Sequence, residues 1–343
     1  MKIRVVNSIS DFENIREEWE CLHQQTRSSV FQSFSFNYFS WVYELNSRTN
    51  ILSILIAFSN KRLIAVFPFY IDKHKRLRFI NDNHIDFCDF IQEDIIDYTA
   101  IYSFLKSNIN FTSIRLINLK KESNTFNFVK SLNDNCRIIK PSLEYSILNI
   151  DKGSFPYNVP HYRSHQKHRV NKAYLKHKDK CHHILNSTND IFPFDEIMLL
   201  SKDMISRGVR REGFFDVQRL RLIRELYNKG FVILSVMKSN NQFTVVNIIL
   251  KEFEEFIFWI DLFNDEQMIN IAGYINFLKY SSLEKNININ FARGRYFYKE
   301  SNFAPIFINL YSVYYFSSLI SKWRFIIFDE LRKSFKLIYK KFC

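Results

Sequence analysis

A strand, a loop and a helix in the second half of the chain could together bind an anion. The residues Asp261, Leu262 and Phe263 end a strand-like run, and a polar loop leads from them to Gly273 in the first turn of an expected helix. Asn270 is a suitable N-cap for that helix. A helix start presents free N–H groups and the positive end of the helix dipole, which suit a phosphate or a carboxylate. The alternative is that Gly273 only lets the helix pack closely on a neighbour.

An arginine-rich segment offers a second site for an anion. We find Arg207, Arg210 and Arg211 within about one helical turn of one another, in the segment SRGVRREGFF. Guanidinium groups donate paired hydrogen bonds to phosphate oxygens. These side chains are therefore candidates for holding a substrate phosphate, and a solvated loop is the alternative.

The positions of the glycines limit where a loop can wrap a phosphate. The chain has six glycines, and all of them follow residue 150: Gly153, Gly208, Gly213, Gly230, Gly273 and Gly294. Such a loop usually needs glycine, because only glycine lets the backbone approach a phosphate so closely. A nucleotide-type cofactor that binds by its pyrophosphate is therefore expected in the second half.

The positive charge is concentrated in two segments. Residues 161–180 carry a net charge of +6 and residues 322–343 carry +5, out of +13 for the whole chain. Solvated helix faces are one explanation, and attraction of phosphates, or of an anionic membrane surface by the tail, is another. Neither segment carries a zinc-finger pattern or an RNA-binding aromatic motif, so no nucleic-acid partner is expected.

Composition and length define the class of protein. With 343 residues, 47% hydrophobic and 24% charged, the chain is expected to be globular and to form two domains. Its longest apolar run has nine residues, whereas a spanning helix needs about 20, and the N-terminus has no signal-peptide pattern. These features predict a cytoplasmic location. The five cysteines form no CxxC pair, so we expect free thiols and no metal site.

The two halves of the chain show the same order of elements. In each half we expect helices, then three antiparallel strands, then a helix and a strand. The strands are expected at 51–58, 63–71, 77–80, 113–119 and 137–150, and then at 231–237, 244–250, 256–262, 287–292 and 306–316. Helices at 12–25, 36–45, 98–105, 125–132, 193–206, 217–228 and 271–284 are expected to flank them.

This order predicts one fold used twice. The segment KGSFPYNVPHY holds one glycine and two prolines, which is typical of a linker. We therefore expect an N-terminal domain over 1–152, a linker over 153–162, a C-terminal domain over 163–316 and a basic helix over 317–343.

Several segments resemble one family. The strand expected over 287–292 continues into the string NFARGRYFYK, which resembles the strand-and-turn signature of a bacterial acetyltransferase family in the GNAT superfamily. The strings GYINFLKYSSLEK and SHQKHRVNKAYLK resemble its small-residue helix start and the basic helix of its second half. In the first half, WECLHQQTRSSVFQSFSFNYFSW resembles the family's entry segment, and AVFPFYI followed by HIDFCDF resembles its strand and acidic loop. The chain departs from the pattern at Asn290 and Arg295, where the family has acids.

The chain thus looks like a double-GNAT protein, similar to cellulose-biosynthesis accessory proteins, sugar N-acyltransferases and peptidoglycan-bridge peptidyltransferases. The resemblance implies an α+β fold of two tandem GNAT-like domains, each a mixed, mostly antiparallel sheet flanked by helices. It also implies a CoA-dependent N-acyltransferase that uses acyl-CoA as co-substrate and holds no tightly bound cofactor. The residues expected to bind acyl-CoA are Asp261, Leu262, Asn270, Ala272, Gly273 and Tyr274.

The implied reaction is direct attack of an amine on a thioester through a tetrahedral intermediate. A backbone N–H near residues 260–262 would stabilise the oxyanion. The proton acceptor is expected in the acidic loop that holds His84, Asp86 and Asp89, although these residues could instead cap or turn the chain. Tyr298 could protonate the departing thiolate or simply pack.

The expected acceptor is a nucleotide-linked amino sugar, such as a dTDP-aminodideoxyhexose used for O-antigen or capsule synthesis. Cationic turns suit its diphosphate. The residues expected to bind it are Arg207, Arg210, Arg211, Arg293 and Lys299.

Two other functions remain open. One is a Fem-like peptidyltransferase that uses aminoacyl-tRNA, although no heptad run of the kind found in those relatives is present. The other is a non-catalytic GNAT-like protein that binds a polysaccharide synthase or a membrane through the basic tail, whose amphipathic part runs from Trp323 to Cys343. Packing of that tail on the body is the alternative to surface binding.

Overall fold

The chain divides into two compact units, each built from separate segments. The computed structural model describes residues 1–93, 96–132, 136–156, 158–159, 162–253, 255–316 and 318–327. Unit 1 comprises residues 1–26, 47–142 and the chain from 310 onward, and unit 2 comprises residues 27–46 and 143–309. Compared with the expected domains, the segment 27–46 therefore joins the second unit, and the last strand returns to the first.

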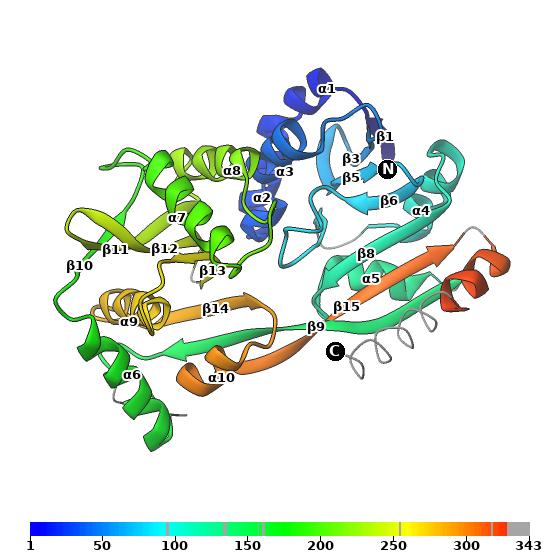
Figure 1. The fold of residues 1–343 in the computed structure, drawn as a ribbon. Helices are drawn as coiled ribbons and strands as arrows, with labels where there is room; N and C mark the ends of the chain where they lie inside the picture. Colours follow the sequence, from blue (N-terminus) through cyan, green and yellow to red (C-terminus); the bar gives the residue numbers. More distant parts are fainter. Residues whose placement is uncertain are drawn as a thin grey trace. The chain divides into compact units, whose positions relative to one another are not determined.

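Unit 1 contains two sheets, which can be followed in Figure 1. The first sheet has the strand order β1 (Lys2–Val6), β3 (Ile54–Ser59), β4 (Arg62–Phe67) and β7 (Ile91–Gln92). The second has the order β2 (Ile51–Leu52), β5 (Phe69–Ile71), β6 (Arg76–Phe79), β8 (Ser113–Leu119), β15 (Ile306–Phe316) and β9 (Arg137–Ile150). Its helices are α1 (Ile9–Asn14), α2 (Arg16–Thr26), α4 (Tyr98–Asn108) and α5 (Asn124–Ser131).

One strand expected in unit 1 is in fact two. The apolar run 63–71 was predicted as a single strand, but it breaks at Pro68, and its two parts join different sheets. Proline has no backbone N–H to donate to a sheet ladder, so it separates β4 from β5. The helix expected over 12–25 is likewise divided, at Ile15, between α1 and α2.

Unit 2 is built on one sheet flanked by helices. The strand order is β10 (Cys181–Leu185), β11 (Val232–Ser239), β12 (Gln242–Lys251), β13 (Glu255–Phe263), β14 (Ile287–Arg293) and β9. The pairs are antiparallel except β13 with β14, which is parallel. Its helices are α3 (Phe34–Ser40), with the turn η2 (Trp41–Leu45) after it, α6 (Ser164–Lys176), α7 (Phe194–Ser206), α8 (Val217–Asn228), α9 (Ile269–Ser281) and α10 (Phe297–Phe303). Helix α9 packs on β11, β12 and β13, and α6 packs on α9 and α10.

Specific contacts hold the segment 27–46 in unit 2. The guanidinium of Arg219 on α8 donates to Glu44, with Nη2 2.8 Å from Oε2. The ring of Phe31 lies 6.0 Å from that of Trp259 on β13. This ion pair and ring contact explain why a segment from the first half of the chain completes the second unit.

Similar hairpin turns occur in the two units. The β3–β4 turn places Asn60 and Lys61 at φ of 48° and 66°, and the β11–β12 turn places Asn240 and Asn241 at 49° and 63°. Two central residues with positive φ match the twist of a hairpin, and asparagine tolerates this conformation well. Repeated hairpins of this kind agree with the repeated order of elements in the sequence.

The region after the last strand is described only in part. Residues 319–327 are helical, and residues 328–343 lie outside the described part of the chain. Most of the basic helix expected over 317–343 therefore lies outside it as well. Within the described residues, we find no helix whose length and apolarity would let it cross a membrane.

Candidate active site

The two parallel strands of unit 2 pair at only one end. The register of β13 with β14 covers Glu255–Ile257 and then stops, while β13 continues to Phe263 beside β12. Past Ile257 the pairing of β13 with β14 does not continue, and at the end of β13 the backbone N–H of Phe263 lies 3.3 Å from Sδ of Met204 instead. Helix α9 starts just beyond the end of β13, as Figure 1 shows.

An ion pair marks the end of β13. Arg210, in the loop after α7, donates from Nη2 to Oδ1 of Asp261 over 2.7 Å, and its guanidinium lies 4.6 Å from the ring centre of Phe214. The side chains of Arg210 and Asp261 are 29% and 15% exposed, so the pair is partly accessible. The structure thus brings together an arginine expected to bind phosphate and an aspartate expected near the cofactor.

Asn247 is a member of this cluster that the sequence analysis missed. It lies opposite Asp261 in the β12–β13 ladder and is fully buried. Neither polar atom of its amide has a hydrogen-bond partner among the described residues. One signal was present in the sequence, because Asn247 interrupts the otherwise apolar run VVNIIL.

Two tyrosines complete the cluster. The hydroxyls of Tyr274 on α9 and Tyr298 on α10 are 3.1 Å apart. Burial raises the pKa of both phenols, and the nearby carboxylate of Asp261 raises each further. Both groups therefore stay protonated well above neutral pH and can donate a hydrogen bond.

Aromatic side chains fill the space beside the separated strands. The rings of Phe258 on β13 and Phe291 on β14 stack with centres 5.7 Å apart. Phe303 on α10 stacks on Phe291 at 5.1 Å, and the Tyr274 ring meets Phe258 at 4.6 Å. This core makes the surroundings of the tyrosine pair apolar, which strengthens electrostatic interactions there.

The start of α9 differs from the prediction in two respects. The helix begins at Ile269, and its N-cap is Met268 at φ 64°, so Asn270 is not the N-cap but a residue of the first turn. No side chain caps the helix start. A Cβ on Gly273 would come within 2.6 Å of Cγ1 of Val245, which identifies close packing on β12 as the role that the fold gives this glycine.

The other residues expected at the cofactor are buried around this start. Leu262, Ala272 and Tyr274 all belong to the core. The backbone of the first turn, rather than these side chains, is what α9 can present to an anion.

Basic residues at the end of α6 hold the loop between β13 and α9. Lys180 donates to Glu266 over 2.8 Å, and Lys176 donates to the side chain of Gln267 over 2.7 Å. The ring Nε2 of buried His177 lies 2.9 Å from the carbonyl oxygen of Gln267. Burial alone would raise the pKa of Glu266, but hydrogen bonds from Asn264 and Lys180 hold it below its usual value.

The remaining expected substrate residues lie in different surroundings. Arg207 donates from Nε to Asp203 over 2.9 Å and from Nη2 to the carbonyl of Phe263 over 2.6 Å. Arg211 is exposed, and Arg293 is half-buried at the end of β14. Arg207 thus supports the end of β13, whereas Arg211 is open to solvent.

Lys299 does not fit the expected contact with a substrate phosphate. It is 1% exposed, and its Nζ donates to four backbone carbonyls, among them those of Phe291 at 2.5 Å and Gly294 at 2.9 Å. The chain after β14 turns at Gly294, φ 97°, and enters α10. The ammonium therefore fastens this turn, because a buried charge needs hydrogen-bond partners.

The expected acidic loop belongs to unit 1. Asp89 accepts hydrogen bonds from the backbone N–H groups of Phe90, Asn124 and Thr125 and from the Thr125 hydroxyl, at 2.6–3.1 Å. Burial raises its pKa to about 6 although these bonds favour the charged form. Of the two roles left open for Asp89, proton acceptor or cap, these bonds support the cap, because they fix the N–H groups of the first turn of α5.

The other two residues of this loop are placed differently. His84 is half-buried in a turn closed by its N–H to the carbonyl of Asn81, 2.9 Å away. Asp86 is 4% exposed. The structure therefore puts the acidic loop in unit 1 and Asp261, Tyr274 and Tyr298 in unit 2.

Comparison with known proteins supports the fold. No family model and no curated protein matches the sequence. The C-terminal domain of a putative lysylphosphatidylglycerol synthetase from Agrobacterium fabrum is 9% identical over 92% of this chain and 95% of that one, with a TM-score of 0.58. L-PGS from Bacillus licheniformis is 12% identical over 92% and 95%, with a TM-score of 0.57. FemX is 8% identical over 91% and 97%, with a TM-score of 0.52.

These similarities concern the fold alone, because the identities are low. The fold is shared with these neighbours over more than 90% of the chain, and unit 2 has the mixed sheet and flanking helices that were expected. The predicted α+β fold class with two GNAT-like domains is confirmed.

Proposed function

We propose that this chain is an N-acyltransferase whose chemistry takes place at the end of β13 in unit 2. The observation that supports the proposal best is the cluster of Arg210, Asp261, Tyr274 and Tyr298 beside the separated strands. It combines a carboxylate that can take a proton from an amine with phenols that can protonate a leaving group. Backbone N–H groups of β13, past its pairing with β14, are proposed to stabilise an oxyanion.

The proposed reaction uses these groups in sequence. The Asp261 carboxylate receives the acceptor ammonium and takes its proton, and the free amine then attacks the acyl carbonyl. These backbone N–H groups of β13 stabilise the tetrahedral oxyanion. When the bond between the acyl carbon and the leaving group breaks, Tyr298 donates its proton to the leaving group. The nitrogen, which still carries one proton more than the amide product, returns a proton to Tyr298, and Asp261 releases its proton to solvent.

Acyl-CoA is the proposed donor. Two features support it: the uncapped first turn of α9 beyond β13 and the apolar aromatic core near the tyrosines. At the adjacent loop, Lys176 is bonded to Gln267 and Lys180 to Glu266. The carboxylates Asp265 and Glu266 in the same loop oppose an anion there, so the lysines must neutralise them.

A nucleotide-linked amino sugar is the proposed acceptor, with surface polysaccharide synthesis as the setting. The support for its diphosphate is narrower than the sequence predicted. Arg207, Arg210 and Lys299 are already bound to protein groups, so the exposed Arg211 is the expected cation that best supports binding of the diphosphate.

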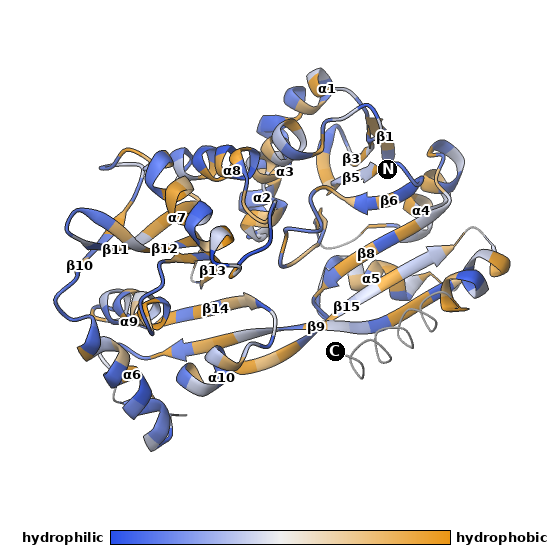
Figure 2. Cartoon of the chain, viewed as in Figure 1, coloured by the Kyte–Doolittle hydropathy of each residue, from blue (hydrophilic) through white to orange (hydrophobic). Residues whose placement is uncertain are grey.

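An aminoacyl donor is the second candidate, and one surface favours it. Helix α6 buries Gln166, Val170 and Ala173 and is mostly hydrophilic in Figure 2. Five exposed cations lie on the helix or next to its ends, and residues 163–178 include no carboxylate: Arg163, Lys167, Lys172, Lys176 and Lys178. Such a face suits a polyanion such as transfer RNA. The names of two neighbours of the same fold, FemX and lysylphosphatidylglycerol synthetase, agree with this candidate.

One assay distinguishes the donors. The whole chain is incubated with acetyl- and longer acyl-CoA and a panel of nucleotide amino sugars, and free thiol and acylated amine are measured. A second series supplies aminoacyl-tRNA and the same acceptors together with amine-bearing peptides and lipids. Turnover with acyl-CoA that Asp261→Asn abolishes supports the first donor, and turnover only with aminoacyl-tRNA replaces it by the second. Absence of turnover in both series overturns the proposed function.

A further inference from the structure

We infer that a cleft in unit 1 binds a small sugar that carries a negative charge. The cleft measures about 450 Å³, a size typical of small-molecule sites. It is lined by residues at the end of β1, along β2 and β5, in the β5–β6 turn and at the end of α4. The proposed acyl-transfer cluster belongs to unit 2, so this inference does not depend on it.

Amides and hydroxyls make up much of the polar lining. Three asparagines line the cleft, namely Asn7, Asn108 and Asn110. Thr49 and Ser53 line it as well, with the Thr49 hydroxyl 3.3 Å from that of Ser47 and the Ser53 hydroxyl donating to the carbonyl of Ile51. An amide both donates and accepts, as does each hydroxyl of a sugar, so the two kinds of group match. Asn108 already donates from Nδ2 to the carbonyl of Phe104 over 2.9 Å, which leaves its Oδ1 to accept from a ligand.

The cleft also has an apolar wall. Ile51 on the edge strand β2 is 57% exposed, and it pairs with Ile71 of β5. Val5 of β1 lines the same cleft. A sugar ring presents C–H groups on one face, and these can cover the exposed Ile51 side chain and remove it from water.

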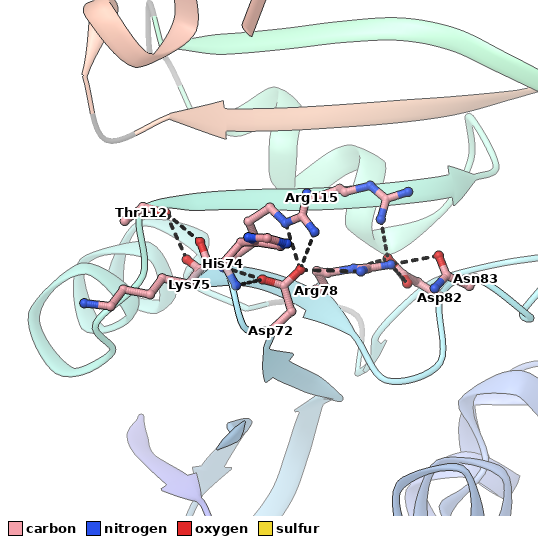
Figure 3. A network of polar contacts seen from close by, with 9 residues as sticks. Asp72, His74, Lys75, Arg78, Asp82, Asn83, Thr112 and Arg115 are labelled. Carbon is pink, nitrogen blue, oxygen red and sulfur yellow. Dashed lines mark hydrogen bonds and ion pairs between the residues drawn. The ribbon is translucent and has the colours of Figure 1, made fainter. Parts of the chain in front are cut away.

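Two exposed lysines give the cleft its charge. Lys73 and Lys75 stand on the β5–β6 turn, and among the described residues neither ammonium pairs with a carboxylate. The carboxylate that lines the cleft, Asp72, is already neutralised: its Oδ2 lies 2.7 Å from Nη2 of Arg76 and 3.5 Å from Nη1 of Arg78. Figure 3 shows this network. The net positive charge of the cleft therefore selects an anionic group.

The turn that carries the lysines is fixed before a ligand arrives. Oδ1 of Asp72 accepts from the backbone N–H groups of His74 and Arg76 at 2.9 and 3.0 Å. Thr112 donates from its backbone N–H to the carbonyl of Lys75 over 2.8 Å, and Lys75 itself is held at φ 55° (Figure 3). A prearranged backbone lowers the entropic cost of binding.

The experiment measures binding of four probes to the full chain by calorimetry. The probes are glucuronate, glucose 6-phosphate, glucose and inorganic phosphate. We expect at least one anionic sugar to bind about 10-fold more tightly than both glucose and phosphate, since it alone uses amides, apolar wall and lysines together. The better of the two anionic sugars identifies the charged group as carboxylate or phosphate. If neither exceeds glucose and phosphate, the inference is overturned.

Variants then place the binding in this cleft. The double variant Lys73→Gln/Lys75→Gln is expected to bind the anionic sugar about 10-fold more weakly. Its thermal unfolding midpoint should not change, because both side chains are exposed. The matched control, Lys61→Gln/Lys121→Gln, removes two exposed lysines elsewhere in unit 1 and should bind as the parent does. Equal affinities of the two double variants would show that the sugar binds elsewhere.

Discussion

Arg210 and Asp261 are joined across 2.7 Å at the end of β13, although 50 residues of chain lie between them. The contact ties the loop after α7 to the strand that carries the proposed acyl-transfer chemistry. Asp261→Asn keeps the size of the side chain and removes its charge. We expect kcat/KM for acyl transfer to fall about 100-fold or more, the usual effect of losing a general base.

A nearby ion pair provides the control for this prediction. Asp203→Asn neutralises the partner of Arg207, 2.7 Å away on α7. It keeps all four side chains of the proposed cluster and the bond from Arg207 to the carbonyl of Phe263. Steady-state rates of thiol release should be close to those of the parent. If the two asparagine variants have the same rate, Asp261 has no special part in the reaction.

The Tyr274–Tyr298 hydroxyl pair leads to a second prediction. Tyr298→Phe removes the proposed proton donor and keeps the ring, so we expect kcat to fall at least about 10-fold with little change in KM. Tyr296→Phe is the matched control, because Tyr296 is 54% exposed and stacks on Tyr298 at 6.0 Å. Loss of activity in both variants, or in neither, would count against Tyr298 as the donor.

Strong local patterns explain why much of the fold could be predicted. The expected bounds of β8, β9, α8 and β15 match those observed, because each is a periodic run with clear turn residues at its ends. The parts that failed depend on tertiary context. Met268 takes the N-cap position of α9 without a side-chain capping bond, so the expected N-cap Asn270 lies in the first turn. Lys299, expected to contact a substrate phosphate, is instead buried and bonded to backbone carbonyls.

The candidate site could be predicted only in part for the same reason. Asp261, Tyr274 and Tyr298 lie at recognisable places along the chain, and the structure brings them together. The pairing of Arg210 with Asp261 spans a long loop, and no local pattern specifies it. The unsatisfied amide of Asn247 depends on burial, which the sequence signals only through one polar residue in an apolar strand.

Close packing at Gly273 leads to a third prediction. Gly273→Ala places a methyl group within 2.6 Å of Cγ1 of Val245, so α9 must shift away from β12. We expect the free energy of unfolding to fall by about 1–3 kcal/mol, measured by urea denaturation. Adding Val245→Ala removes the nearest clashing atom, so the double variant should be more stable than Gly273→Ala and Val245→Ala together would imply. Simple additivity would mean that the packing at Gly273 is not what the glycine provides.

The buried ammonium of Lys299 leads to a fourth prediction. Lys299→Met leaves the carbonyls of Phe291 and Gly294 without their donor, and we expect a loss of about 3 kcal/mol in unfolding free energy. Lys202→Met, on the exposed face of α7, should change stability little. If Lys299→Met keeps its stability but has a raised KM for the acceptor, Lys299 binds substrate, as the sequence predicted, and does not stabilise the turn.

Asp89 predicts a pH dependence of stability. Burial raises its pKa to about 6 in the folded chain from an ordinary value of 3.8, so the folded state holds this proton more tightly than the unfolded state does. Stability from this group therefore falls as pH rises from about 4 to 6, by at most about 1.4 kcal/mol per pH unit. Asp89→Asn removes this contribution and can still accept from Thr125. Urea denaturation at pH 4, 5, 6 and 7 gives the free energy of unfolding of both proteins. Relative to the parent, the variant should become more stable as the pH rises from 4 to 6. The same pH dependence in both proteins would contradict the role given to Asp89.

Strand β15 has a consequence for how the chain matures on the ribosome. Its residues from 310 to 316 belong to unit 1, where they pair with β8, yet β8 ends at Leu119. Translation proceeds at about 5–20 residues per second, so one edge of β8 waits about 10–40 seconds for its neighbour. During that interval a nascent chain exposes a row of unsatisfied peptide groups, which are templates for aggregation. Newly made protein should therefore depend on chaperones more strongly than refolding of the finished chain does.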